Sequence, residues 1–366
     1  MFYTFYMAIQ ITEEKNCTGC TACQAVCPVS CIAMQEDAKG FLYPSVDYDL
    51  CIECGLCERT CPLLKPISQE NKVLSVYAAK AKDKEILRKS SSGGMFIPLS
   101  DAMLKEGGVV YGAAFNPLME VSHCRCTTFT ERDRCVGSKY VQSNLVGVLD
   151  QVKKDLNEKR PVLFTGTPCQ VAGLLSFLAQ TNTDTSLLVC CDVFCFGVPS
   201  PKVWKDYLKQ VEREKGEPVK EAFFRDKTYG WADFSLRLET EHTASVEKNN
   251  ENAYMQLFLQ RLINRPSCFD CHFSNLDRKG DLSIGDYWGI EHSMPDFFES
   301  NGVSVTLVNS QKGKAWMEKI KDTLSLRESN LNDCMQPVLS GPTAQPIGYE
   351  SFWKQYARSG FGEERT

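Results

Sequence analysis

Two copies of one cysteine pattern stand near the start of the chain, Cys17-Thr-Gly-Cys20-Thr-Ala-Cys23-Gln-Ala-Val-Cys27-Pro28 and Cys51-Ile-Glu-Cys54-Gly-Leu-Cys57-Glu-Arg-Thr-Cys61-Pro62. In each copy three cysteines at two-residue gaps are followed by Cys-Pro. Such gaps let one tight turn aim three thiolates at one centre, and soft sulfur ligands suit iron–sulfur clusters. A zinc or disulfide knot is the alternative, but zinc sites generally use thiolates in pairs. The doubled pattern therefore predicts two iron–sulfur clusters.

This pattern resembles the two-cluster ferredoxins of bacteria, in which the fourth cysteine of each run ligates the other run's cluster. The resemblance assigns one 4Fe–4S cluster to Cys17, Cys20, Cys23 and Cys61. It assigns the second cluster to Cys51, Cys54, Cys57 and Cys27. We therefore expect the chain to carry electrons.

Composition places these clusters in a large globular chain. Its 366 residues are 43% hydrophobic and 24% charged, which leaves room for a cluster domain and a large body. Nineteen cysteines without a cleavable signal peptide favour a reducing, cytoplasmic setting. The apolar segment Met1–Ile9 is far shorter than the ~20 residues of a membrane span. We expect an edge strand or an upstream start there, with Met7 as a possible initiator and a short strand over Ala8–Thr12.

Acidic charge is concentrated in residues 1–62, which carry three basic and eight acidic side chains. The resulting formal charge of −5 equals that of the whole chain. Phosphate binding needs a basic patch, so a nucleic-acid partner is disfavoured. The acidic face is either simply solvated or a docking surface for a basic redox partner. The expected partners of the chain are a ferredoxin or another redox protein and a small-molecule acceptor or donor.

A polar run with two prolines over residues 62–74 predicts a domain boundary, with a ferredoxin domain over residues 1–65 and a body over residues 74–366. In the body, short apolar strands alternate with amphipathic helices, which predicts an α/β fold, α+β overall, with a largely parallel sheet. A subdivision near residue 215 stays open. Strands are expected at 74–80, 108–115, 161–165, 186–194, 234–240, 281–288 and 303–309. Helices are expected at 94–105, 144–157, 169–179, 201–214 and 312–324.

Two segments at predicted helix starts could hold an anionic cofactor, Ser90-Ser-Ser-Gly-Gly94 and Phe164-Thr-Gly-Thr-Pro-Cys-Gln170. Free N–H groups and the helix dipole attract anions at such positions. Both segments are equally compatible with ordinary helix starts. The usual dinucleotide fingerprint and phosphate loop are missing from the sequence.

From about Leu74 to Gly289 the chain resembles the flavin-containing beta subunits of the deazaflavin (coenzyme factor 420) hydrogenases and dehydrogenases. The matching segments are Ser91–Gly94, Gly137–Tyr140, Gly166–Gln170, Cys195–Ser200, Arg265–Cys271 and Gly280–Gly289. The resemblance implies FAD bound by the body, close to a third 4Fe–4S cluster. One departure is Phe196, where many relatives carry His; losing this polar group should change the cluster potential.

The expected ligands of the third cluster are thiols at loop positions, one pair of them at a two-residue gap. They are Cys169, Cys195, Cys268 and Cys271. Buried packing thiols or a zinc site are the alternatives. The other cysteines are expected to be packing residues, although Cys124 and Cys126 could form an exposed redox pair. These others are Cys31, Cys124, Cys126, Cys135, Cys190, Cys191 and Cys334.

The residues expected to bind FAD fall into two groups. The phosphates are expected at Ser91, Ser92, Gly93 and Gly94, and the ring or ribityl chain at Thr165, Gly166, Thr167 and Gln170. Lys139 and Tyr140 are the expected charge and stacking partners, and Lys139 and Asp286 the expected catalytic residues, because a cation near N1 stabilises reduced flavin. A solvated lysine is the alternative. Asp281, Asp286 and Trp288 cover the flavin, build the substrate pocket or merely end a strand. His272 could tune the cluster or shuttle a proton.

Together these features predict an iron–sulfur flavoprotein oxidoreductase. Electrons would pass between a one-electron carrier such as ferredoxin and an organic two-electron acceptor through the clusters and FAD. The alternative is an electron-transfer subunit of a larger hydrogenase- or dehydrogenase-like complex without its own substrate. A structural metal-binding scaffold is a third hypothesis. The organic substrate, the direction of flow and the oligomeric state stay open.

Overall fold

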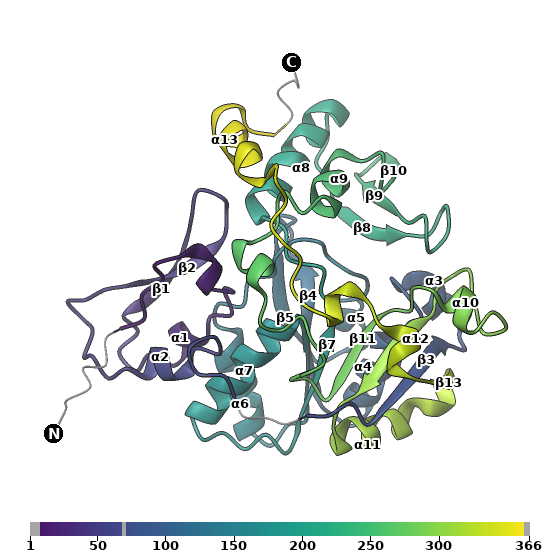
Figure 1. The fold of residues 1–366 in the computed structure, drawn as a ribbon, viewed down its shortest axis with the longest axis horizontal. Helices are drawn as coiled ribbons and strands as arrows, with labels where there is room; N and C mark the ends of the chain where they lie inside the picture. Colours follow the sequence, from purple (N-terminus) through teal and green to yellow (C-terminus); the bar gives the residue numbers. More distant parts are fainter. Residues whose placement is uncertain (1–7, 68–70, 362–366) are drawn as a thin grey trace.

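The computed structural model describes residues 8–67 and 71–361. A small N-terminal module stands beside a larger body built around one sheet (Figure 1). The module contains η1 (Glu14–Asn16), α1 (Ala22–Ala25), α2 (Leu56–Thr60) and an antiparallel pair, β1 (Ile32–Glu36) with β2 (Leu42–Val46). The strand expected over Ala8–Thr12 is not formed; instead the Ile9 N–H lies 3.3 Å from the Cys57 sulfur. The expectations for Met1–Met7 lie outside the described residues.

The sheet of the body has eight strands in the order β13-β3-β12-β11-β7-β6-β4-β5. Neighbours β4, β6, β7 and β11 run parallel, whereas β5, β12, β3 and β13 pair antiparallel with their neighbours. The expectation of a largely parallel sheet is therefore wrong, and the sheet is mixed. The physical reason is that β4 and β5 form a hairpin, and β11 returns to β12 without a helix that crosses the sheet. The strands are β3 (Ser75–Ala81), β4 (Val109–Phe115), β5 (Val121–Cys126), β6 (Val162–Gly166), β7 (Leu188–Val193), β11 (Leu282–Asp286), β12 (Ser304–Val308) and β13 (Leu324–Ser329).

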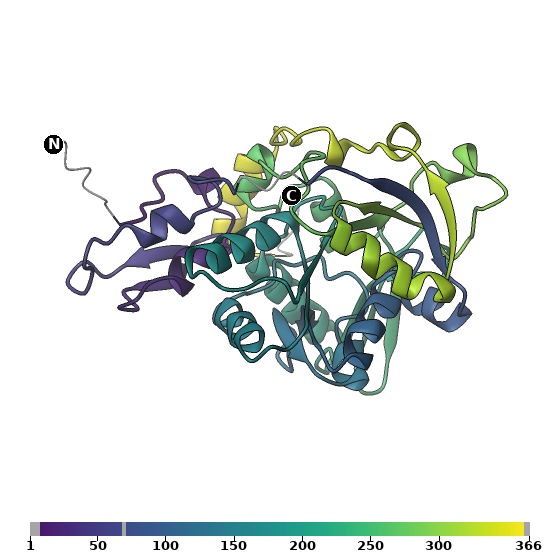
Figure 2. The ribbon, with the colours of Figure 1, turned by 90° about the horizontal axis from the view of Figure 1, so that it is seen from below.

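Helices cover both faces of this sheet. On one face α6 (Val148–Asn157) and α7 (Pro168–Gln180) bury a core with Phe164 and Leu188. On the other face α4 (Phe96–Lys105) and α11 (Gln311–Ile320) bury a core with Leu163 and Val189. A strand covered on both sides reads as a continuous apolar run, which explains why β7 was predictable from its sequence. The N-terminal module packs on the side that carries α6 and α7 (Figure 2).

A second layer of elements covers the upper part of the body in Figure 1. It contains the antiparallel strands β8 (Glu221–Asp226), β9 (Ser235–Glu239) and β10 (Ala244–Lys248), with α8 (Pro201–Lys215), α9 (Ala253–Leu259) and α13 (Tyr349–Ser359). An aromatic core around Trp204 and Tyr254 joins them. The short connecting elements are α3 (Lys84–Lys89), α5 (Phe129–Asp133), η2 (Pro266–Asp270), α10 (Ile290–Ser293), η3 (Lys321–Thr323), α12 (Leu331–Cys334) and η4 (Pro337–Leu339).

The segments that were predicted to bind the cofactor lie along one edge of the sheet, which we call the functional edge. The carboxyl ends of parallel strands meet at the same edge, so the loops after β6, β7 and β11 all open there. The start of antiparallel β12 lies at this edge too, where Ser304 Oγ accepts the Gly93 N–H at 2.9 Å. No helix in the described part of the chain is long and apolar enough to cross a membrane.

Candidate redox centres

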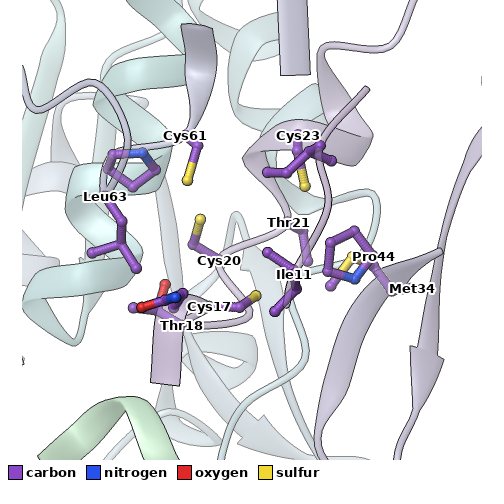
Figure 3. A pocket seen from close by; sticks show the side chains of 13 residues that line it. Ile11, Cys17, Thr18, Cys20, Thr21, Cys23, Met34, Pro44, Cys61 and Leu63 are labelled. Atoms are coloured by element: carbon purple, nitrogen blue, oxygen red, sulfur yellow. The ribbon is translucent and has the colours of Figure 1, made fainter. Parts of the chain in front are cut away.

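The first hollow of the N-terminal module is lined by four of the predicted ligands. Cys17, Cys20, Cys23 and Cys61 border a space of about 350 Å³. Figure 3 shows the sulfur atoms of Cys20 and Cys61 pointing toward one another. The side chains of Cys17 and Cys23 line the same space. The structure therefore brings together the set assigned to one cluster, although Cys61 lies 38 residues beyond Cys23 in the sequence.

A second hollow of about 310 Å³ is lined by Cys27, Cys51, Cys54 and Cys57, the other predicted set. A fifth thiol also lines this hollow: Cys31, expected to be a packing residue, is buried, and its sulfur lies 3.4 Å from that of Cys27. Burial raises the pKa of Cys31 to about 12, so this thiol stays protonated.

The two cysteine runs share an unusual backbone as well as a spacing. Gly19 and Glu53 occupy the same position in the two runs and are both left-handed, with φ of 71° and 51°. Thr21 and Gly55 also correspond and have φ of 63° and 65°. Non-glycine residues rarely adopt this conformation, so its repetition shows two equivalent ligand loops.

The N-terminal module is tied to the body by a buried guanidinium. Arg265 is fully buried and donates to the carbonyl oxygens of Cys17 at 2.8 Å and Leu42 at 2.9 Å, and to Gln142 Oε1 at 3.0 Å. The Gln142 amide in turn donates to the Thr18 carbonyl at 3.0 Å. Arg265 thus fixes the first ligand loop against the body.

A third set of four thiols lies close together in the body. Cys169 lies in the first turn of α7, Cys195 follows β7, and Cys268 and Cys271 lie in and just after η2. Burial raises the pKa of each thiol, to about 12 for Cys195 and Cys268, and the negative charges of their neighbours add to the effect. Each of the four interacts electrostatically with the other three. Four half-buried thiols from separate loops that lie close enough to interact are the donors that an iron–sulfur cluster takes, so the donor set fits the predicted third cluster.

Arg278 connects two of the segments that carry this thiol set. It is buried, forms an ion pair with the fully buried Asp192 at the end of β7, and donates to the Phe273 carbonyl at 3.3 Å and the Val193 carbonyl at 3.2 Å. It therefore connects the strand that leads to Cys195 with the loop that follows Cys271. Phe196, at the position where many relatives were expected to carry His, stacks against the Arg261 guanidinium. The guanidinium carbon lies 3.8 Å from the centroid of the Phe196 ring.

The predicted phosphate residues Ser91–Gly94 lie between α3 and α4, at the functional edge of the sheet. The Ser91 hydroxyl accepts the Ser138 N–H at 2.7 Å, and the Ser92 hydroxyl donates to the Val303 carbonyl at 2.9 Å. A Cβ on Gly93 would lie 2.2 Å from the Ala79 carbonyl oxygen, so this glycine is required by close packing. Gly94 is left-handed, with φ of 88°. No side chain caps the first turn of α4.

The predicted ring-side residues follow β6 and form the start of α7. The Thr165 hydroxyl donates to the Tyr111 carbonyl at 3.0 Å, and Gln170 Oε1 accepts the Thr167 N–H at 2.9 Å. Gly166 packs closely, since a Cβ would lie 2.9 Å from Gln170 Oε1. The Thr167 hydroxyl lies 3.1 Å from the Cys169 sulfur, so this corner borders the thiol set.

Tyr140 and Asp286 are brought together by Arg225, which the sequence interpretation missed. The buried Arg225 donates to both carboxylate oxygens of Asp286 at 2.7 and 3.0 Å, and to the Tyr140 hydroxyl at 3.2 Å. Trp231 donates to Asp286 at 2.6 Å and stacks on the half-exposed Trp288, with ring centroids 4.8 Å apart. An arginine, a carboxylate and an indole face therefore meet at the end of β11.

The remaining predicted residues occupy distinct places. The Lys139 ammonium donates to the carbonyls of Arg134, Val136 and Gly137 at 2.9 to 3.1 Å, and burial lowers its pKa to about 8. Its role as a cation at the flavin stays a prediction. Asp281 lies at the opposite end of β11 and accepts from the Ser310 hydroxyl at 2.6 Å, and His272 is exposed beside Cys271.

Sequence comparison agrees with this organisation. Residues 159–333 match the family described as the C terminus of the coenzyme F420 hydrogenase/dehydrogenase beta subunit, and residues 16–63 match the 4Fe-4S dicluster domain. A subunit of the F(420)H(2) dehydrogenase of Methanosarcina mazei is 23% identical over 220 residues, which are 56% of this chain and 62% of that protein. The chain therefore spans less than two thirds of that relative. The ferredoxin 7Fe of Hydrogenibacillus schlegelii is 44% identical over 57 residues, 16% of this chain and 67% of that protein.

A solved structure shares the fold. A chain of the F420-reducing [NiFe] hydrogenase complex from Methanosarcina barkeri aligns with a TM-score of 0.50 at 19% identity, covering 70% of this chain and 82% of that chain. The protein is thus an iron–sulfur protein with a redox role. Its residues 159–333 are similar to the C terminus of the beta subunits of the coenzyme F420 hydrogenases and dehydrogenases, and a 4Fe-4S dicluster domain precedes them at residues 16–63.

Proposed function

We propose that this protein is an iron–sulfur flavoenzyme that passes electrons between a one-electron carrier and an organic two-electron acceptor through three 4Fe–4S clusters and FAD. The observation that carries this proposal is the contact between Cys20 and α7. A Cβ on Gly173 would lie 2.6 Å from the Cys20 Cβ and 2.8 Å from its sulfur. Cys169 stands one turn earlier on the same helix, ~6 Å along its axis. Clusters held by Cys20 and by Cys169 would therefore be close neighbours, as electron transfer requires.

The thiol sets supply a continuous route in this proposal. Electrons would enter at Cys27, Cys51, Cys54 and Cys57, pass to the cluster of Cys17, Cys20, Cys23 and Cys61, and continue to Cys169, Cys195, Cys268 and Cys271. The first two sets lie in one small module, and Arg265 and Gly173 hold this module against the body. The route would end at the edge of the sheet, where the Thr167 hydroxyl borders the Cys169 sulfur.

FAD is proposed at this edge, where it would convert single electrons into a two-electron transfer. Its predicted contacts, Ser91–Gly94 and Thr165–Gln170, open onto the same edge. Two cationic side chains lie there: Arg225, paired with Asp286, and Lys227, which donates to the Ser92 carbonyl at 3.2 Å. Their positive charge would favour the pyrophosphate or the anionic reduced ring. The Trp288 indole, stacked on Trp231, offers an apolar face for an acceptor.

A second candidate is an electron-transfer subunit of a larger complex without its own small-molecule substrate. It is favoured by the name of one relative, a dehydrogenase subunit, of which this chain spans 62%. An enzyme should turn over alone with dithionite or ferredoxin and a soluble acceptor. A complex subunit should instead copurify with a larger partner and lack turnover alone.

The first test is iron, sulfide and flavin analysis of anaerobically purified wild type and Cys169→Ser. We expect about twelve irons per wild-type chain and about eight in the variant, because one cubane is lost. Matched Cys190→Ser, a buried thiol outside the proposed sets, should keep about twelve. Equal iron in wild type and Cys169→Ser would remove the third cluster from the proposal.

Flavin binding is tested separately with Ser92→Glu. The added carboxylate should repel the pyrophosphate, and we expect flavin absorbance to disappear while the iron content stays at the wild-type value. Ser92→Ala, which removes only the hydrogen bond to Val303, is the control and should retain flavin. Full flavin retention in Ser92→Glu would place the cofactor elsewhere.

A further inference from the structure

Three cysteines outside the proposed cluster ligands meet at the edge strand β5. The Cys124 sulfur lies 3.6 Å from that of Cys126 and 3.4 Å from that of Cys135, and the sulfurs of Cys126 and Cys135 are 3.8 Å apart. They are the one group of possible metal ligands with such mutual spacing in the described part of the chain. Cys126 and Cys135 are buried and Cys124 is half-buried. We call these residues the thiol triad.

Local structure fixes the triad. Cys124 and Cys126 point to the same side of β5 because side chains alternate along a strand. Cys135 follows α5, and its N–H donates to the Arg132 carbonyl at 2.9 Å. Arg132 is buried and forms an ion pair with Asp101 on α4, which holds α5 in place.

A glycine on the neighbouring strand makes room for the third sulfur. Gly112 pairs with Cys124 across the β4–β5 ladder. A Cβ on Gly112 would lie 3.0 Å from the Cys135 Cβ and 3.1 Å from its sulfur. Any side chain at this position would push Cys135 away from the other two thiols.

We propose that Cys124, Cys126 and Cys135 bind a zinc ion as three thiolate ligands. Zinc prefers tetrahedral thiolate coordination with Zn–S bonds of about 2.3 Å, which sets neighbouring sulfurs about 3.8 Å apart. The three measured separations reach 3.8 Å or fall short by at most 0.4 Å. Small side-chain rotations would bring all three sulfur–sulfur distances to the value for zinc. The thiolate ligands of a cubane cluster bind separate iron atoms, so their sulfurs lie further apart than these three.

The surrounding charges suit such a site. Three thiolates and Zn²⁺ carry a net charge of −1, and the Lys139 ammonium interacts electrostatically with all three sulfurs. Arg134 also acts on Cys124. Lys139 is held there by three backbone carbonyls, so its position does not depend on the metal.

The fourth ligand of the zinc ion would be water. The neighbouring imidazole of His123 is engaged through both nitrogens, with the Ser143 hydroxyl at 2.7 Å and the Thr165 carbonyl at 2.8 Å. The partly exposed Cys124 marks the side from which water reaches the ion. Zinc sites with three protein ligands keep such an open position.

The test is zinc analysis of anaerobically purified protein with its iron–sulfur centres intact. Wild type should hold about one zinc per chain, with a zinc K-edge sulfur shell near 2.3 Å from about three sulfurs. The triple variant Cys124→Ala/Cys126→Ala/Cys135→Ala should lose this zinc and keep its iron. The control Cys190→Ala/Cys191→Ala/Cys334→Ala removes three buried thiols elsewhere and should keep both metals.

Two results would overturn the proposal. One is zinc content that is equal in wild type and the triad variant, because zinc would then sit in incompletely filled cluster sites. The other is wild type without zinc whose triad thiols react rapidly with N-ethylmaleimide or form a disulfide, as seen by peptide mass spectrometry. Because the alkylation experiment uses wild type, it tests the proposal even where the triad variant fails to fold. Triad thiols that react with N-ethylmaleimide only after a zinc chelator is added would support the site.

Discussion

At the scale of single residues, the buried Arg278 supports the segments that carry Cys195 and Cys271 of the proposed third cluster site. Its partner Asp192 is fully buried, and its other hydrogen bonds reach backbone carbonyls of two segments. Removing one member of such a pair leaves an uncompensated buried charge, which costs about 3–5 kcal/mol.

Arg278→Met should therefore lower the free energy of unfolding by about 3–5 kcal/mol and release iron from the third site while the N-terminal module keeps its iron. Anaerobic urea unfolding and iron analysis measure both effects. The exposed pair of Lys321 with Glu318 provides the control, because Lys321→Met should change neither quantity. Unchanged stability in Arg278→Met would show that the pair contributes little.

The sequence indicated which cysteines lie together in the N-terminal module, but it did not indicate which arginines hold the surrounding segments in place. Cysteine spacing encodes ligand chemistry locally, so the sets that line the two hollows could be assigned from it. Arg265, Arg278 and Arg225 could not be assigned, because each is fixed by a partner far away in the sequence. These partners are Cys17, Asp192 and Asp286, which lie 248, 86 and 61 residues away. The thiol triad was anticipated only in part: Cys124 and Cys126 were considered as an exposed redox pair, whereas Cys135, expected to be a packing residue, joins them only when α5 folds against β5.

At the scale of elements, α7 contributes to two parts of the molecule, the proposed third cluster site and the contact with the N-terminal module. Its first turn carries Cys169, and one turn later Gly173 receives Cys20 from the N-terminal module. Glycine weakens a helix by about 1 kcal/mol relative to alanine, so contact rather than propensity explains its presence.

Gly173→Ala should therefore destabilise the docking of the module despite the gain in helix propensity. We expect lost or altered cluster signals in electron paramagnetic resonance for the site of Cys17, Cys20, Cys23 and Cys61, and a lower unfolding midpoint. Ala179→Val, a larger side chain at an exposed position of α7, should leave both unchanged. A wild-type spectrum in Gly173→Ala would mean that Cys20 tolerates displacement.

The elements themselves were mostly predictable, and the strand directions were not. The strands and helices expected from 74 to 214 are present with small shifts at their ends. The strands β5, β8, β10 and β13 were missed because their residues are only partly buried and show weak apolar patterns. Without them, the alternation of strand and helix suggested a parallel sheet. The predicted domain limits at residues 65 and 74 stay predictions.

At the scale of the whole molecule, the far end of the N-terminal module presents an acidic and apolar surface. Tyr48, Leu50 and Ile52 are 56 to 60% exposed and lie close in sequence to Cys51, a predicted ligand that lines the second hollow. Asp49 and Glu53 are exposed between and beside them. Apolar contacts bordered by charge suit a transient redox partner that carries basic groups.

Asp49→Asn/Glu53→Gln should slow reduction by a basic one-electron carrier several-fold at ~10 mM salt, because steering is lost. The difference from wild type should vanish near ~1 M salt, where the screening length is about 3 Å. Stopped-flow measurement of cluster bleaching tests this, with Glu318→Gln on the distant α11 as the control. Equal rates at low salt would mean that carriers dock elsewhere.

The contact between Arg265 and the Cys17 carbonyl also bears on biosynthesis. The two residues are 248 positions apart, so the ribosome completes the first ligand loop long before it makes the arginine that secures it. At about 5–20 residues per second, this interval lasts roughly 12–50 s. Until α7 has been made and has folded, the nascent module exposes the surface that later meets this helix. Delivery of iron and sulfide to the nascent chain therefore has a window that closes when the body folds.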